Sequence, residues 1–302
     1  MSAAAAEPLT TSATPPPSTT SRANGGRERP SAIATVILLA GAFYCLIPVV
    51  WVLMASSKSP AELFSTFTYA PSTNLWSNIT DLSGYRDGLF WRWMLNTALY
   101  AGVGAGLSTV VSAMAGYAMA KYRFRGRTVL FNILLAGVLV PGVILAVPQY
   151  LLFAKLGLTN TYWSVLLPSV ISPYGIYLAR IYVSASIPDE VVEAARTDGA
   201  QDGRIFTAIV VPMMLPGLVT IFLFQFVAIW NNFLLPYVML GNDRLFSVTV
   251  GLSSLLHQGS AQPALYASVI TGSLLSILPL LALFLMLQRF WQVDLAAGAV
   301  KR

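Results

Sequence analysis

The residues whose types and spacing could do chemistry lie mainly in one charged segment, about residues 186–212, within an otherwise apolar sequence. This segment contains Glu190, Glu193, Ala194, Ala195, Asp198 and Gly199, followed by Ile209 and Pro212. The two glutamates could pair with cations of a second protein, and consecutive alanines leave room for a partner's groove to approach the backbone. Such chemistry is docking rather than catalysis. From spacing alone, a solvated amphipathic surface helix without a partner explains the segment equally well.

The local sequence predicts the shape of this segment. Ser186, Pro188 and Asp189 have the form of a helix start, because serine can cap, proline fits the first turn, and an acidic residue there complements the helix dipole. Gly199 supplies a left-handed stop. We therefore predict a helix of about three turns, then Gly203 and a second helix leading back toward a membrane. The small-residue face of the first helix would comprise Val191, Val192, Ala194 and Ala195.

A second set of polar and aromatic residues lies within apolar stretches. It consists of Gln225, Trp230, Asn231, Asn232, Tyr237 and Thr271. Sugars need hydrogen-bonding partners together with flat apolar surfaces, so these residues are candidates for a substrate pathway. Trp230 and Tyr237 fit an interfacial aromatic belt equally well, and the Thr271 hydroxyl fits helix packing beside Gly272. The adjacent asparagines are harder to explain structurally, because unpaired amides at membrane depth are costly.

Ionisable groups are nearly absent from the apolar stretches, and this excludes several classes of function. No Asp or Glu falls inside them, which argues against an ion-coupled secondary transporter. His257 and Cys45 are each the single residue of their type and lack neighbouring co-ligands, so we predict no metal site and no membrane enzyme. No catalytic residue is assigned, and a neutral substrate is favoured.

Composition indicates which elements must position these residues. The chain has 302 residues, of which 56% are hydrophobic and 10% charged, with a mean hydropathy of +0.68. A soluble domain carries about 25% charged residues, so we predict an all-α membrane protein. Residues 1–30, rich in Pro, Ser and Thr, are expected to form a disordered tail, and residues 31–302 the transmembrane domain. Six spans are predicted, at about 33–55, 94–120, 129–153, 162–183, 212–235 and 265–287.

The distribution of Lys and Arg predicts the orientation. The short connection after the second span carries Lys121, Arg123, Arg125 and Arg127, and such clusters remain in the cytoplasm. With that connection inside, thirteen of the 18 Lys and Arg residues lie on the inner side and five on the outer side. Both termini and residues 184–211 are then cytoplasmic. The basic cluster is thus a topology signal, and we predict no nucleic-acid partner.

The sequence also resembles a known family. Glu193-Ala194-Ala195, Gly199, Ile209 and Pro212 match the EAA loop of ABC importer permeases, although Val211 stands where leucine is usual. The similarity extends across most of residues 90–302. It includes Asn96-Thr97, Phe124-Arg125-Gly126, Leu156-Gly157-Leu158, Trp230-Asn231 and the tail 296–301. The chain looks like the smaller permease of a maltose-type carbohydrate importer, with a type I permease fold.

This resemblance implies a function and a set of partners. The loop would form a coupling helix in a cleft of an ATPase subunit, and the complex would hold a second homologous permease, two ATPase subunits and an extracytoplasmic substrate-binding protein. ATP and Mg²⁺ would bind the ATPase subunits, because this chain has no G-x-x-x-x-G-K-[ST] motif. Outer loops with Trp76, Trp91, Trp93 and His257 are expected to meet the binding protein. A phosphorylated polyol such as glycerol 3-phosphate remains an alternative cargo.

Overall fold

A computed structural model of the chain describes residues 32–259 and 262–299. The chain divides into two compact units, one up to Ile47 and one from Pro48 onward. The predicted tail at 1–30 lies outside the described residues, as do the last two positions of the tail motif, 300 and 301. The second unit carries every residue of the predicted coupling segment and of the predicted substrate pathway.

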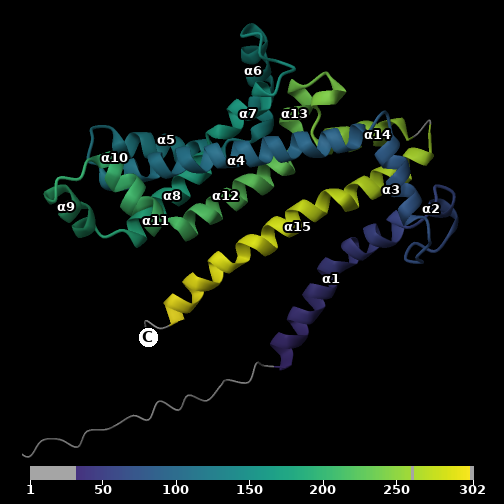
Figure 1. Cartoon of the computed structure of the whole chain (residues 1–302), viewed down its shortest axis with the longest axis horizontal. Helices are drawn as coiled ribbons and strands as arrows, with labels where there is room; N and C mark the ends of the chain where they lie inside the picture. The colour runs from purple at the N-terminus through teal and green to yellow at the C-terminus, as the bar shows by residue number, and fades with distance from the viewer. Residues whose placement is uncertain (1–31, 260–261, 300–302) are drawn as a thin grey trace, which may run out of the picture. The chain divides into compact units, whose positions relative to one another are not determined.

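The described residues form helices, with no strand among them (Figure 1). The α-helices are α1 (Ala32–Ser56), α2 (Glu62–Ser65), α3 (Leu75–Gly84), α4 (Leu89–Lys121), α5 (Arg127–Leu139), α6 (Gly142–Lys155), α7 (Trp163–Val170), α8 (Pro173–Ser186), α9 (Asp189–Thr197), α10 (Asp202–Ile205), α11 (Val211–Met213), α12 (Leu215–Trp230), α13 (Leu234–Met239), α14 (Val248–Gln258) and α15 (Ala264–Ala299). A π-helix, η1 (Phe206–Val210), and a 3₁₀-helix, η2 (Asp243–Leu245), complete the described elements.

The helices confirm an all-α membrane protein but correct two of the predicted spans. Four stretches are long and apolar enough to cross a membrane, and the number is six if each of two bent helix pairs counts as one span. The third predicted span, 129–153, is bent by 103° between α5 and α6. The fifth, 212–235, is preceded by an 80° bend and ends as a helix at Trp230 instead of Leu235.

Proline explains the bend in the third span. Val140 precedes Pro141 and is extended, with φ −73° and ψ 119°, because the proline ring excludes the helical conformation of the residue before it. Pro141 itself is extended and caps α6. The sequence prediction treated Pro141 as tolerable within a continuous helix, whereas here it separates two helices that run in different directions.

α4 is the central helix of the second unit, and α8 and α12 pack along it (Figure 1). Close packing of α4 on α8 depends on Gly116. A Cβ atom at this position would lie 2.5 Å from Ala179 Cβ and 2.7 Å from the backbone nitrogen of Arg180. Any side chain at 116 would therefore push the two helices apart. Small residues that let backbones touch are the usual basis of helix association in membranes.

Candidate functional site

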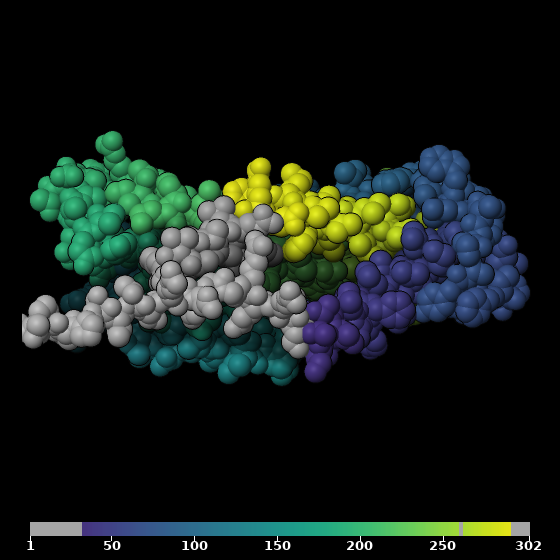
Figure 2. Space-filling model, turned by 90° about the horizontal axis from the view of Figure 1, so that it is seen from below, coloured from purple at the N-terminus to yellow at the C-terminus, as the bar shows by residue number. Residues whose placement is uncertain are grey.

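The predicted coupling segment forms a short helix at one end of the second unit. α9 follows α8 after only Ile187 and Pro188, and α9, α10 and α11 lie together at the left of Figure 1. In the space-filling view this green region again occupies the left end (Figure 2). The helix has nine residues, close to the predicted length.

The start of α9 differs from the prediction. Ser186 is the last residue of α8 and does not cap α9, whose N-terminal boundary is Pro188 with no side-chain hydrogen bond. Asp189 instead pairs with Lys121 at the end of α4. Lys121 also donates a hydrogen bond of 2.6 Å to the carbonyl oxygen of Ile187. The Lys121 side chain is only 7% exposed, so this cation fastens the base of α9 to α4.

The contact also affects protonation. The hydrogen bond from Lys121, its charge, and the more distant charge of Arg123 hold the pKa of the Asp189 carboxyl below its ordinary value of 3.8. Asp189 therefore remains ionised at neutral pH, and the ion pair persists there.

The end of α9 confirms the left-handed stop at Gly199. Its φ is +79°, and the amide of Ala200 donates to the Ala195 carbonyl at 3.0 Å while the Gly199 amide donates to Arg196. This is the Schellman arrangement that closes helices. A Cβ at Gly199 would meet nothing within 4 Å, so the position demands glycine for its backbone conformation and not for space. Arg196 then pairs with Asp202 at 3.2 Å, linking α9 to α10.

The faces of α9 are divided differently from the predicted small-residue face. Val192 and Ala195 are buried in a cluster with Tyr117 of α4, Val183 of α8 and Ile221 of α12. They therefore anchor the helix instead of meeting a partner. The outward residues are Glu190, Glu193, Ala194 and Asp198. α9 thus presents an acidic surface while its buried side reaches three long helices.

Ile209 and Pro212 lie in the turn that returns to the membrane. Proline has no amide hydrogen, so Pro212 cannot donate to the carbonyl four residues earlier. The chain adopts a π-helix there, and the Val211 amide donates to the Phe206 carbonyl. Ile209 is partly buried against the same cluster as Val192, whereas Pro212 is exposed. These two predicted residues shape the return path and do not lie on the outer face of α9.

Two of the predicted pathway residues meet in one cavity. Gln225 and Asn232 line a space of about 280 Å³ together with Gln149 and Ser169, where α6, α7, α12 and α13 come together. The Gln225 amide donates to Ser172 Oγ at 2.6 Å. Sequence reasoning missed Gln149 and Ser169. A usable signal existed for Gln149, a polar residue directly after a proline in an apolar run.

The other predicted pathway residues lie elsewhere. Trp230 is buried and stacks on Phe226, with ring centroids 5.5 Å apart. Asn231 donates to the Val227 carbonyl at 2.9 Å within its own chain turn. Tyr237 is exposed and lines a separate cavity with His257, and Thr271 is fully buried with no partner for its hydroxyl.

The opposite end of α4 holds the η2 segment through side chains. Asn96 donates to the carbonyls of Arg244 and Phe246 at 2.9 and 3.0 Å, and Tyr100 donates to that of Leu245 at 2.9 Å. Trp93 is buried and donates to the Asp243 carbonyl at 2.7 Å. Trp93 therefore serves the core and is not available to a binding protein, unlike the exposed Trp76 and Trp91.

Comparisons with known proteins agree with this arrangement. Residues 109–292 match the family described as binding-protein-dependent transport system inner membrane component. The chain is 33% identical to the arabinooligosaccharides transport system permease protein AraQ of Halalkalibacterium halodurans, over 91% of this chain and 99% of that protein. It is 30% identical to the lactose transport system permease protein LacG of Rhizobium radiobacter, over 91% and 98%. Its fold is similar to a chain in the crystal structure of a bacterial ABC transporter involved in the import of the acidic polysaccharide alginate, with a TM-score of 0.74, 24% identity, and coverage of 85% and 94%.

Proposed function

This chain belongs to the family of binding-protein-dependent transport system inner membrane components, and we propose that it imports a neutral carbohydrate with energy received through α9. It is a multi-pass cell-membrane transporter subunit and not an enzyme. The observation that carries the proposal is the construction of α9. Its outward face is acidic and free for a partner, while its buried face and Lys121 join it to α4.

A neutral carbohydrate fits the cavity lined by Gln149, Ser169, Gln225 and Asn232. Three amides and a hydroxyl offer both donors and acceptors, and none of the described residues that line this cavity is charged. The remaining lining is apolar, including Leu145 and Ile229, which suits the C–H faces of a sugar ring. Relatives named for arabinooligosaccharide and lactose transport support this cargo class.

A phosphorylated polyol is the weaker alternative. A phosphate group is normally met by Arg, Lys or a helix N-terminus. No Lys or Arg lines this cavity among the described residues. We therefore place glycerol 3-phosphate second, as one of the cargoes to be screened.

We propose the partners that the resemblance implies. A second homologous permease would complete the pathway, two ATPase subunits would bind ATP and Mg²⁺, and an extracytoplasmic substrate-binding protein would deliver the cargo. The exposed Glu190, Glu193, Ala194 and Asp198 would seat α9 in a cleft of one ATPase subunit. The concentration of Lys and Arg around residues 121–127 supports a cytoplasmic position for this end of the protein.

The proposed cycle is alternating access. Closure of the ATPase pair on ATP displaces α9, and the displacement passes to α4 through Lys121 and to α8 and α12 through the buried cluster. The helices then open toward the binding protein and receive the cargo. Hydrolysis returns the ATPase pair to its open state, so that the cavity faces the cytoplasm.

The cargo assignment is tested with the complete transporter in nanodiscs, together with its binding protein. Arabino-oligosaccharides, lactose and glycerol 3-phosphate are compared at equal concentration, with ATP hydrolysis as the readout. We expect at least one neutral sugar to stimulate hydrolysis several-fold, and glycerol 3-phosphate to leave it at the basal rate. Stimulation by glycerol 3-phosphate alone would reverse the order of the two cargoes.

The coupling assignment is tested at Gly199. Gly199→Val should abolish sugar-stimulated ATP hydrolysis, because a β-branched residue is strained at φ +79°. Gly199→Asn is the matched control, since asparagine tolerates the left-handed conformation, and it should retain most of the stimulation. On the outer face, Glu193→Trp should also abolish stimulation while leaving membrane insertion intact. Unchanged stimulation in Gly199→Val and Glu193→Trp would show that energy enters elsewhere.

A further inference from the structure

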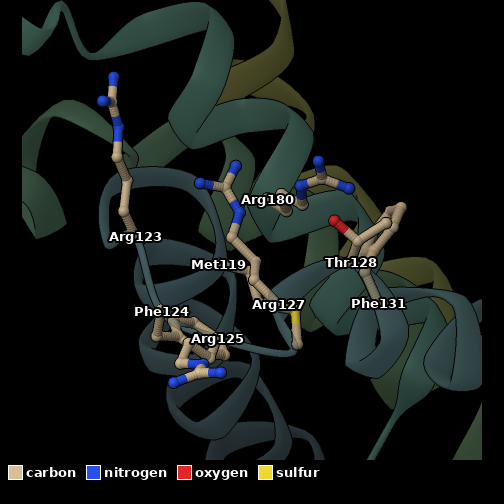
Figure 3. Close-up of a pocket in the computed structure, with 8 residues that line it drawn as sticks. All are labelled: Met119, Arg123, Phe124, Arg125, Arg127, Thr128, Phe131 and Arg180. Atoms are coloured by element: carbon tan, nitrogen blue, oxygen red, sulfur yellow. The ribbon is translucent and has the colours of Figure 1, made fainter.

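A cavity of about 510 Å³ lies beside the turn that joins α4 to α5. Four arginines line it: Arg123, Arg125, Arg127 and Arg180. In Figure 3 the guanidinium groups of Arg123, Arg127 and Arg180 lie toward the upper side, and that of Arg125 lies below them. Three of these residues come from the connecting turn and the start of α5, whereas Arg180 comes from α8. We call this cavity the arginine pocket.

The charge in the arginine pocket is not neutralised by this chain. None of the ion pairs found among the described residues includes these four arginines. Arg127 donates one hydrogen bond of 3.2 Å to the Tyr122 carbonyl, and Arg123 faces Asp189 only at longer range. Four guanidinium groups gathered in one cavity repel one another. An anion with several acceptor oxygens would relieve this repulsion, and phosphate matches guanidinium geometry especially well.

Arg180 is placed where a membrane lipid can reach it. It lies six residues before the end of α8, about 9 Å along the helix axis. Its guanidinium carbon lies 3.7 Å from the centre of the Phe131 ring on α5, a cation–π contact that fixes the charged group beside an apolar surface. The pocket therefore lies at the ends of membrane-spanning helices, where polar headgroups meet hydrocarbon.

A groove continues from the arginine pocket along the helices. It has a volume of about 550 Å³ and shares Phe131 and Arg180 with the pocket. Its other lining residues are Tyr177, Ile181, Ser184 and Ala185. The adjoining surface of α5 exposes Val129 and Ile133. A cationic cavity thus opens directly into a groove with a largely apolar wall.

We propose that the arginine pocket binds the phosphate of an anionic phospholipid, with its acyl chains along the groove that starts at Phe131. Only an amphiphile uses both halves of this site. Inorganic phosphate would leave the groove empty, and an acidic protein surface would not reach between α5 and α8. Basic pockets between membrane helices are a recognised means of selecting anionic headgroups.

The test uses the full chain in detergent and native mass spectrometry. Phosphatidylglycerol and phosphatidylcholine with identical acyl chains compete for the protein, and bound lipid is counted per chain. The wild type should retain phosphatidylglycerol in preference. Arg125→Gln combined with Arg180→Gln should weaken that retention at least about tenfold, because each cation near a membrane surface contributes to anion attraction. Arg92→Gln, an exposed arginine at the opposite end of α4, is the matched control and should behave as wild type.

Three outcomes would overturn the proposal. The double variant could keep the preference for phosphatidylglycerol while eluting and melting as the wild type does. Millimolar inorganic phosphate could displace the lipid completely, which would identify free phosphate as the ligand. Alternatively, the double variant could keep its lipid but no longer co-purify with the ATPase subunits, which would make this surface a protein interface.

Discussion

The two ends of α4 are built on different principles. At the end that starts with Leu89, Trp93, Asn96 and Tyr100 hold the backbone of residues 243–246 through hydrogen bonds between positions about 150 apart in sequence. At the other end, Lys121 makes the one side-chain bridge from α4 to the base of α9 among the described residues. The rest of the α9 attachment is the buried side of a short helix.

This difference indicates what each end is for. Side-chain donors that satisfy buried backbone carbonyls fix a single geometry, because breaking any of them leaves a polar group without a partner. A small apolar contact and one ion pair hold a helix in place but let it move as a unit. The first end keeps its shape, and the second end is suited to being displaced by a partner. Substitutions at the two ends should therefore separate loss of stability from loss of coupling.

The largest effect is expected from Trp93→Ala. This removes a buried indole and its hydrogen bond to Asp243, and truncation of a buried aromatic residue costs about 3–5 kcal/mol. Thermal unfolding in detergent should show a markedly lower melting temperature. Trp76→Ala is the matched control, since Trp76 is 74% exposed, and it should change stability by less than about 0.5 kcal/mol. Equal losses in both variants would mean that the first end is not specially fixed.

The next effect in size is that of Asn96→Leu. The substitution keeps the volume but leaves the carbonyls of Arg244 and Phe246 without their donor, at a cost of about 1–3 kcal/mol. Unfolding should again report the loss. Asn231→Leu serves as the control, because the Asn231 amide is exposed and bonds only within its own turn. If Asn231→Leu were as destabilising as Asn96→Leu, the hydrogen bonds to residues 243–246 would not explain the difference.

Lys121→Met should have the opposite profile. We expect sugar-stimulated ATP hydrolysis to fall toward the basal rate, because α9 loses its link to α4. The melting temperature should change little, since the Asp189 side chain is already 75% exposed. Lys155→Met, at the exposed last turn of α6, is the control and should keep full stimulation. A large drop in stability with unaltered stimulation would assign Lys121 to the fold rather than to coupling.

The smallest effect is expected from pH. The pKa of Asp189 is lowered in the folded protein, so the contribution of the ion pair is complete above the ordinary value of 3.8 and is lost as pH falls through the lower, folded value. Stimulated hydrolysis should therefore gain no pH dependence from this pair between about pH 5 and 8. Asp189→Asn, compared with wild type over that range, should lower stimulation by the same factor at every pH. A difference that grows or shrinks across this range would show that the pair titrates there.

Much of the fold could be read from the sequence, because apolar stretches and proline positions are local properties. The spans, the short helix α9 and the stop at Gly199 belong to this class. The bend at Pro141 was harder to predict, since a proline in a membrane helix can be accommodated or can break it, depending on neighbours. The base of α9 was wrong in detail because Asp189 had a local role available, as a cap partner of Ser186, and a distant one, with Lys121. Local sequence does not reveal which one prevails.

The substrate pathway was the least predictable part of the candidate site. Gln225 and Asn232 lie in the cavity, whereas Trp230, only two residues away from Asn232, points into the core. A helix distributes consecutive residues over all its faces, so a polar cluster in sequence is not a cluster in space. Gln149 and Ser169 joined the cavity from α6 and α7, which the bend at Pro141 and the break after Val170 had reoriented. That contribution depends on tertiary structure alone.

The tight contact at Gly116 has a mechanical consequence. With Ala179 against its backbone, α4 cannot slide or turn independently of α8, so the two helices form one stiff rod whose foot is α9. Its length along α4 is about 50 Å. A tilt of about 5° at the foot moves the far end by roughly 4 Å, and that end grips residues 243–246 too firmly to leave them behind. The chain is thus a lever, and its transport stroke is set by the length of α4.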